Sequence, residues 1–218
     1  MLTAVFAASA FAIAIATPPR SGPNCSVSCI SYPYTTVASF VPNDYLWMYP
    51  GILVVLAFVV LMNCIHHSAP EDKKVFSQVG LSFALISATI IATDYFIQLA
   101  VVQPSLLKGE VDSLSLFSQY NPHGIFIGLE DVGYLMMSAA FLFAGMTFVG
   151  PGRVERALRW IFVVSALAAI MALIGLSLYY GAGLEYRFEV AVLAINWSVL
   201  VVSGVLLSLL FRRTGGTE

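Results

Sequence analysis

The chain alternates long apolar runs with short polar connections. Six such runs cover approximately residues 2–17, 45–65, 76–102, 124–149, 158–180 and 188–211. An α-helix rises about 1.5 Å per residue, so about 20 apolar residues cross a hydrocarbon core roughly 30 Å thick. The pattern therefore predicts an all-α protein: a polytopic transmembrane helix bundle of six spans, forming a single domain over residues 1–218.

The first apolar run has two interpretations. As a membrane span it is short, about 24 Å by helical rise, which a bilayer accommodates by thinning locally. As a secretory signal it offers Ala14-Ile15-Ala16 as a cleavage site, although no Lys or Arg precedes the apolar residues. We expect the run to be retained as a first span. If it is a cleaved signal, five spans remain.

Composition supports a membrane location. Hydrophobic residues make up 59% of the chain and charged residues 10%, with a mean hydropathy of +0.88. Soluble domains carry about 25% charged residues, so the principal surroundings of this chain are membrane lipid. The ten basic residues are scattered in short loops and form no patch. Nucleic acid is therefore excluded as a partner.

The basic residues alternate from one side of the predicted bundle to the other. Three of them, Arg20, Lys108 and Arg187, lie in the connections after the first, third and fifth spans. The connections after the second and fourth spans and the C-terminal tail hold the other seven: Lys73, Lys74, Arg153, Arg156, Arg159, Arg212 and Arg213. Cytoplasmic loops carry an excess of Lys and Arg. This bias predicts that both termini are cytoplasmic and that residues 18–44 and 103–123 are outer loops. We expect the plasma (inner) membrane of a prokaryote.

Polar side chains interrupt three of the spans at similar depth. On the fourth span, steps of seven, four and four residues place His123, Glu130, Tyr134 and Ser138 along one helix face, with Asp131 rotated by about 100°. The same spacing argument groups Ser87, Asp94 and Gln98 on the third span, and Glu189 and Asn196 on the sixth. By helical rise, Asp94, Glu130 and Asn196 lie about 9–12 Å below the outer ends of their spans.

We expect these polar faces to meet in the outer half of the bundle. The predicted cluster consists of Asp94, Gln98, Glu130, Asp131, Tyr134 and Asn196. His123 is an interfacial residue near the helix start or, alternatively, a proton donor to the cluster. An acid at mid-helix costs about 2.5–3.5 kcal/mol on insertion scales, and the spans contain no Lys or Arg to neutralise it. At least one carboxyl is therefore expected to hold a proton or bind a cation.

The remaining polar residues indicate a disulfide and no cofactor. Cys25 and Cys29 lie four apart in an outward loop where oxidation is permitted, so we predict a disulfide, with free thiols or a metal pair as alternatives. His66 and His67 lie at the inner end of the second span, far from His123, so neither haem nor a metal site is expected. All lysines lie in loops, which excludes a retinal Schiff base within the bundle, and common phosphate-loop and hydrolase motifs are absent.

Three functions fit this pattern. The first is an outer-leaflet acidic pocket that binds or moves a proton, a cation or a small polar or cationic solute. The second is an intramembrane enzyme acting on a lipid-like substrate, with one carboxyl as general acid and its neighbour as base. The third is an accessory subunit of a membrane complex, or a homo-oligomer, whose acids pair with a partner's helix. The acids are otherwise structural hydrogen-bonding groups, each bond contributing about 0.6 kcal/mol.

Overall fold

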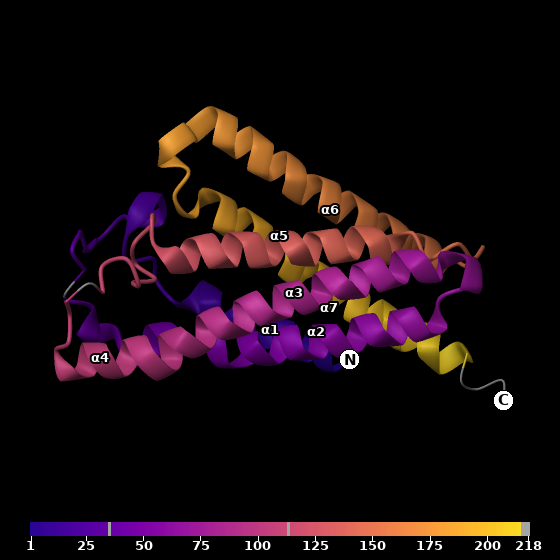
Figure 1. The fold of residues 1–218 in the computed structure, drawn as a ribbon, viewed down its shortest axis with the longest axis horizontal. Coiled ribbons are helices and arrows are strands. Elements are labelled where there is room, and N and C mark those ends of the chain that lie inside the picture. The colour runs from indigo at the N-terminus through magenta and orange to yellow at the C-terminus, as the bar shows by residue number, and fades with distance from the viewer. Residues whose placement is uncertain (35, 113, 215–218) are drawn as a thin grey trace.

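The computed structural model describes residues 1–34, 36–112 and 114–214, and this part of the chain contains helices and loops but no strand (Figure 1). The all-α prediction is therefore confirmed. The α-helices are α1 (Leu2–Ala16), α2 (Met48–Ser68), α3 (Lys74–Ile97), α4 (Gln103–Lys108), α5 (Ile125–Gly145), α6 (Arg153–Tyr180) and α7 (Tyr186–Thr214). A π-helical turn, Gln98–Val102, joins α3 to α4. Short 3₁₀ turns occur at Gly22–Asn24, Val37–Phe40, Asn43–Tyr45, Glu71–Lys73 and Gly181–Gly183.

Within the described chain, five helical stretches are long and apolar enough to cross a membrane. They are Asn43–Ser68, Glu71–Lys108, Ile125–Gly145, Arg153–Gly183 and Tyr186–Phe211. The exterior of the bundle is apolar too: Leu56 and Val60 on α2, and Leu178 on α6, have exposed side chains. Large exposed apolar surfaces on helices of this length are typical of contact with membrane lipid. The chain is therefore an integral membrane helical protein.

The predicted first span is shorter than the other five. α1 has 15 residues, which corresponds to about 22 Å of helix. It packs closely in the bundle: Ala7 and Ala10 are fully buried, and the Phe11 ring lies 5.8 Å from that of Trp197 on α7. A Cβ atom added at Gly204 would lie 3.0 Å from the Cβ of Ala4. Small residues thus allow the backbones of α1 and α7 to approach closely.

The helix of the third span does not end at residue 102, where the predicted span ends. The helical path continues through the π-turn and α4 as far as Lys108, and Gly109 then ends it with a φ of 73°. Pro104 does not stop the helix, because it lies in the first turn of α4, directly after the π-turn. Proline is tolerated in a first turn, where its missing N–H would have no partner within the helix. The predicted outer loop 103–123 therefore begins about six residues later, at Gly109.

α5 lies at the centre of the helix packing. It contacts α3, α6 and α7, and α1 and α2 complete the opposite side of the bundle. α3 approaches α5 closely at Gly133, where a Cβ atom would lie 2.6 Å from Cγ1 of Ile91. Figure 1 shows α6 running alongside α5 at one end of the bundle and diverging from it at the other.

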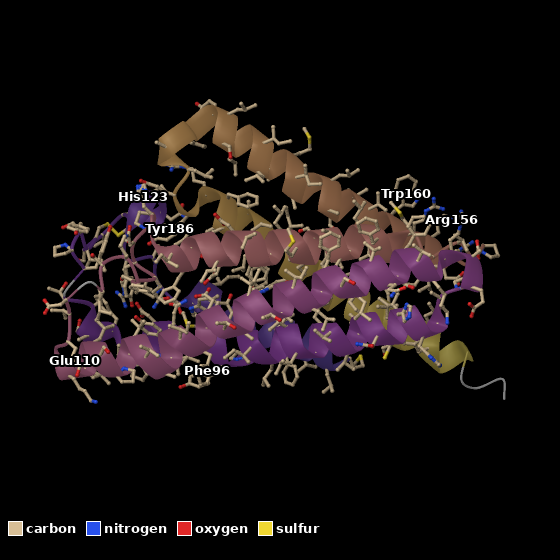
Figure 2. The ribbon with its side chains drawn as sticks, viewed as in Figure 1. Phe96, Glu110, His123, Arg156, Trp160 and Tyr186 are labelled. Carbon is tan, nitrogen blue, oxygen red and sulfur yellow. A yellow bond between two sulfur atoms is a disulfide. The ribbon has the colours of Figure 1, made fainter. Side chains whose placement is uncertain are left out.

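The two groups of connections lie at opposite ends of the bundle. Glu110, His123 and Tyr186 are found at one end, whereas Arg156 lies at the other (Figure 2). This separation agrees with the alternation of basic residues from which the orientation was predicted. The side chains of Arg212 and Arg213 lie outside the described part of the chain. The cytoplasmic position of the termini, and the choice of membrane, stay predictions. We call the end that holds Glu110 the outer end.

Candidate functional site

Two acids meet where α3 packs against α5. Asp94 on α3 and Glu130 on α5 are 0% and 2% exposed, and their carboxyl groups lie close enough to interact electrostatically. Gln98, one turn further along from Asp94 and also fully buried, donates a hydrogen bond from Nε2 to Asp94 Oδ1 at 3.1 Å. The structure therefore brings these three residues together, as the helix-face and depth arguments suggested.

A third acid, Glu189, extends this pair to α7. Its carboxyl group interacts directly with that of Glu130, and Asp131 lies nearby. The sequence analysis placed Glu189 on the same face as Asn196 but did not include it in the cluster. The shared face was the signal that could have identified it. We call Asp94, Glu130, Asp131 and Glu189 the carboxyl series.

The carboxyl series has few hydrogen-bond donors, such as Gln98 beside Asp94, and no basic partner among the described residues. Each member has one buried oxygen without a partner there: Asp94 Oδ2, Glu130 Oε2, Asp131 Oδ1 and Glu189 Oε2. Leaving a buried polar atom unpaired costs about 1–3 kcal/mol, and most such atoms in proteins are paired. The ion pairs of the described chain all lie elsewhere, at Arg20–Asp44, Lys73–Asp72, Lys74–Glu71 and Arg187–Glu185. The arrangement is suited to holding protons or a cation.

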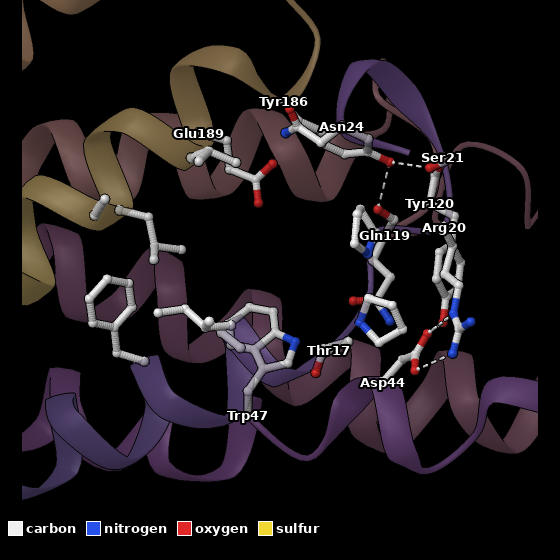
Figure 3. A pocket seen from close by; sticks show the side chains of 18 residues that line it. Thr17, Arg20, Ser21, Asn24, Asp44, Trp47, Gln119, Tyr120, Tyr186 and Glu189 are labelled. Atoms are coloured by element: carbon white, nitrogen blue, oxygen red, sulfur yellow. Dashed lines mark hydrogen bonds and ion pairs between the residues drawn. The ribbon is translucent and has the colours of Figure 1, made fainter. Parts of the chain in front are cut away.

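Glu189 also forms part of the wall of a cavity at the outer end of the bundle. The cavity has a volume of about 390 Å³ and lies between the end of α1, the start of α2 and the start of α7. Figure 3 shows the Glu189 carboxyl projecting into this space, with Trp47 and Gln119 across from it. Glu189 therefore connects the buried acids with a space at the outer end.

Polar residues at the rim of the cavity hydrogen-bond to one another. Arg20 binds Asp44 through two hydrogen bonds, from Nε to Oδ2 at 2.9 Å and from Nη2 to Oδ1 at 3.2 Å (Figure 3). Tyr120 Oη also donates to Asp44 Oδ2, at 3.1 Å. The hydrogen bonds that Arg20 donates to Asp44 raise the pKa of the Arg20 guanidinium, and burial raises the pKa of Tyr120. The charges of Arg20 and Asp44 thus neutralise each other.

Tyr134 and Asn196 are close to the carboxyl series but belong to a separate hydrogen-bonded network. Tyr134 Oη lies 2.9 Å from Tyr95 Oη and accepts a hydrogen bond from Trp197 Nε1 at 2.9 Å. Asn196 Nδ2 donates to Ser138 Oγ and to the carbonyl oxygens of Tyr134 and Val192, while its Oδ1 accepts from Ser138 Oγ. Asn196 therefore joins α5 to α7 through Ser138 and the Tyr134 carbonyl, and also bonds Val192 within α7. Its membership of the acid cluster stays a prediction.

His123 also lies apart from the carboxyl series. Its side chain is exposed at the outer end of the bundle, and its backbone N–H donates to Asn121 Oδ1 at 2.9 Å (Figure 2). The residue sits before the first turn of α5, so its side chain is set by the loop and not by the face of the helix. This placement supports the interfacial interpretation and gives no support to proton donation.

The predicted disulfide is present in the outer loop. Cys25 and Cys29 are joined, with their Cα atoms 5.9 Å apart. Cys64 is a free thiol with an exposed side chain on α2. In the part of the chain that the structure describes, no three or more His, Cys, Asp or Glu side chains are arranged to hold a metal ion.

Comparisons of the chain with protein-family models, with curated proteins and with solved structures find no match.

Proposed function

We propose that the protein binds a proton or a monovalent cationic group at the carboxyl series and takes it up from the outer cavity. One observation carries the proposal: Glu189 lines the cavity and also contacts the buried carboxyl of Glu130. Through this residue, a group entering from outside reaches acids that are otherwise enclosed by α3, α5 and α7.

Electrostatics favour a positively charged occupant. Two ionised carboxylates in contact repel each other strongly when little water screens them. The described residues supply no basic side chain to the series. A proton shared between Glu130 and Glu189 relieves the repulsion and gives an unpaired oxygen a donor, and a bound cationic group does the same.

The packing favours exchange with the outer side. Toward the inner end, three fully buried rings fill the space between α2, α5 and α6: Phe58 lies 5.3 Å from Phe141, and Phe141 lies 5.0 Å from Phe162. On this proposal the packed rings hinder exchange with the inner end, so the site loads from the outer side.

The cavity next to the acids is the observation that favours the enzyme alternative. An acid–base reaction requires two groups within hydrogen-bonding reach of the substrate. Of the carboxyl series, Glu189 lines the cavity, whereas Asp94 and Glu130 lie behind it. One carboxyl at the surface of the cavity suits binding better than it suits paired acid–base chemistry.

Infrared spectroscopy of the full chain in lipid nanodiscs tests the proposal. We expect a C=O stretching band of protonated carboxyl at neutral pH, which Glu130→Gln diminishes. Glu110→Gln is the matched control, because Glu110 is an exposed acid of the outer loop. The proposal would be overturned if the Glu130→Gln spectrum were identical to that of the unaltered protein and if sodium or potassium ions did not change the carboxyl bands of the unaltered protein.

A further inference from the structure

We infer that the outer cavity binds an amphipathic organic amine, with the protonated amine at Glu189 and the apolar body between α1 and α7. The inference rests on the proposed function, because Glu189 belongs to the carboxyl series. The inference specifies the chemical class of the ligand, which neither the buried acids nor the fold indicates alone.

The charges on the cavity wall select a cation. Its lining includes one basic residue, Arg20, and two acids, Asp44 and Glu189. Arg20 is already paired with Asp44 through two hydrogen bonds, and its guanidinium lies 4.1 Å from the centre of the Phe40 ring. An anion would have to displace Asp44 from Arg20. A cation instead meets Glu189, whose Oε2 has no partner among the described residues.

The remainder of the wall is suited to an apolar body. From α1 and α7 come six side chains without polar groups: Phe11, Ala14, Ile15, Val190, Leu193 and Ala194. A volume of about 390 Å³ is within the range of about 300–1,000 Å³ typical of small-molecule sites. Trp47 lies across the cavity from Glu189, where an indole ring favours a cationic group (Figure 3). One charged end and one apolar side define an amphipathic ligand.

The location suggests that the ligand arrives through the outer leaflet. Ile15 and Val190 line the cavity and are also 71% and 51% exposed, on the surfaces of α1 and α7 that face lipid. Glu189 lies three residues into α7, about 4.5 Å below the helix start, near the level of lipid headgroups. An amphipathic amine dissolved in a bilayer holds its charged end at this level and its apolar body below. The same orientation fits the cavity.

Saturable binding of decylamine to the full chain in nanodiscs tests the inference, with empty nanodiscs to correct for partitioning. We expect binding of one decylamine per protein, and much weaker binding of decanoate and decanol, which have the same chain with an anionic or a neutral head. Glu189→Gln should weaken decylamine binding about tenfold or more, because it removes the charge that pairs with the amine. Glu110→Gln is the control and should leave binding unchanged.

A second variant keeps the test informative if Glu189→Gln does not fold. Leu193→Trp fills the apolar part of the cavity and leaves Glu189 in place, so it should abolish decylamine binding while the infrared carboxyl band persists. Decanoate binding as tightly as decylamine, or unchanged decylamine binding in both variants, would overturn the inference. A carboxyl band that responds to Glu130→Gln, without saturable amine binding, would refute the ligand class and leave the proposed function standing. Absence of the band, together with a carboxyl spectrum that does not respond to sodium or potassium ions, would refute the proposed function itself.

Discussion

Two polar groups lie side by side in the outer half of the bundle, and they differ in how their hydrogen bonds are satisfied. In the network of Tyr95, Tyr134, Ser138, Asn196 and Trp197, the side-chain donors and acceptors have partners at 2.7–3.2 Å. In the neighbouring carboxyl series, each acid has a buried oxygen without a partner in the described chain. Both groups are fixed by the packing of α5 against α3 and α7.

We assign a structural role to the network and propose a binding role for the carboxyl series on the basis of this difference. A fully satisfied network joins helices and has no capacity for another hydrogen bond. A set of acceptors without donors is stable only when protons or a cation complete it. Substitutions should therefore affect the network through the stability of the bundle, and the carboxyl series through what it binds.

The largest expected effect comes from removing the centre of the network. Trp197→Ala deletes a fully buried ring that lies 5.8 Å from Phe11 and 6.1 Å from Trp47, together with the hydrogen bond to Tyr134. The free energy of unfolding should fall by about 3–5 kcal/mol, as for other buried tryptophans. Denaturant titration of the protein in mixed micelles would measure this change.

The control for this substitution is Trp160→Ala on α6. Trp160 is 60% exposed, so its removal should change the free energy of unfolding by less than about 1 kcal/mol. Equal losses for the two tryptophans would mean that the network does not hold α1, α2 and α7 together.

A pair of isosteric substitutions tests the comparison directly. Asn196→Asp replaces an amide nitrogen that has three acceptors within hydrogen-bonding distance with an oxygen that cannot donate when ionised, and it should cost about 1–3 kcal/mol of unfolding free energy. Glu130→Gln places a donor among unpaired acceptors and should leave stability unchanged within about 0.5 kcal/mol. Unfolding curves of both variants at neutral pH would show the asymmetry. Equal costs for the two would place both residues in one structural network.

The smallest effect is expected from the outer loop. Alkylation of unreduced, denatured protein should modify one cysteine, Cys64, because Cys25 and Cys29 are joined. Reduction should lower stability only slightly, since the bridge closes a short loop and such closures have a small entropic effect. Modification of all three cysteines would contradict the disulfide and weaken the assignment of this loop to an oxidising outer side.

The amino-acid sequence by itself determined the membrane location, the helical class and much of the acid cluster. Apolar runs of sufficient length define spans whatever the packing, because the thickness of a bilayer is fixed. Residue spacing and depth brought Asp94, Gln98 and Glu130 to one region, because each helix has a regular period. The spacing of Cys25 and Cys29 was likewise enough to predict their disulfide.

The tertiary structure alone decided which polar faces meet. Periodicity defines the face of a helix on which a residue lies, but the rotation of that helix relative to its neighbours depends on packing. Asn196 and Glu189 share one face of α7, yet the first is bound to Ser138 and the second contacts Glu130 beside the cavity. The cavity itself is formed by segments from both halves of the chain, so its combination of one unpaired carboxyl with an apolar wall exists only in the folded bundle.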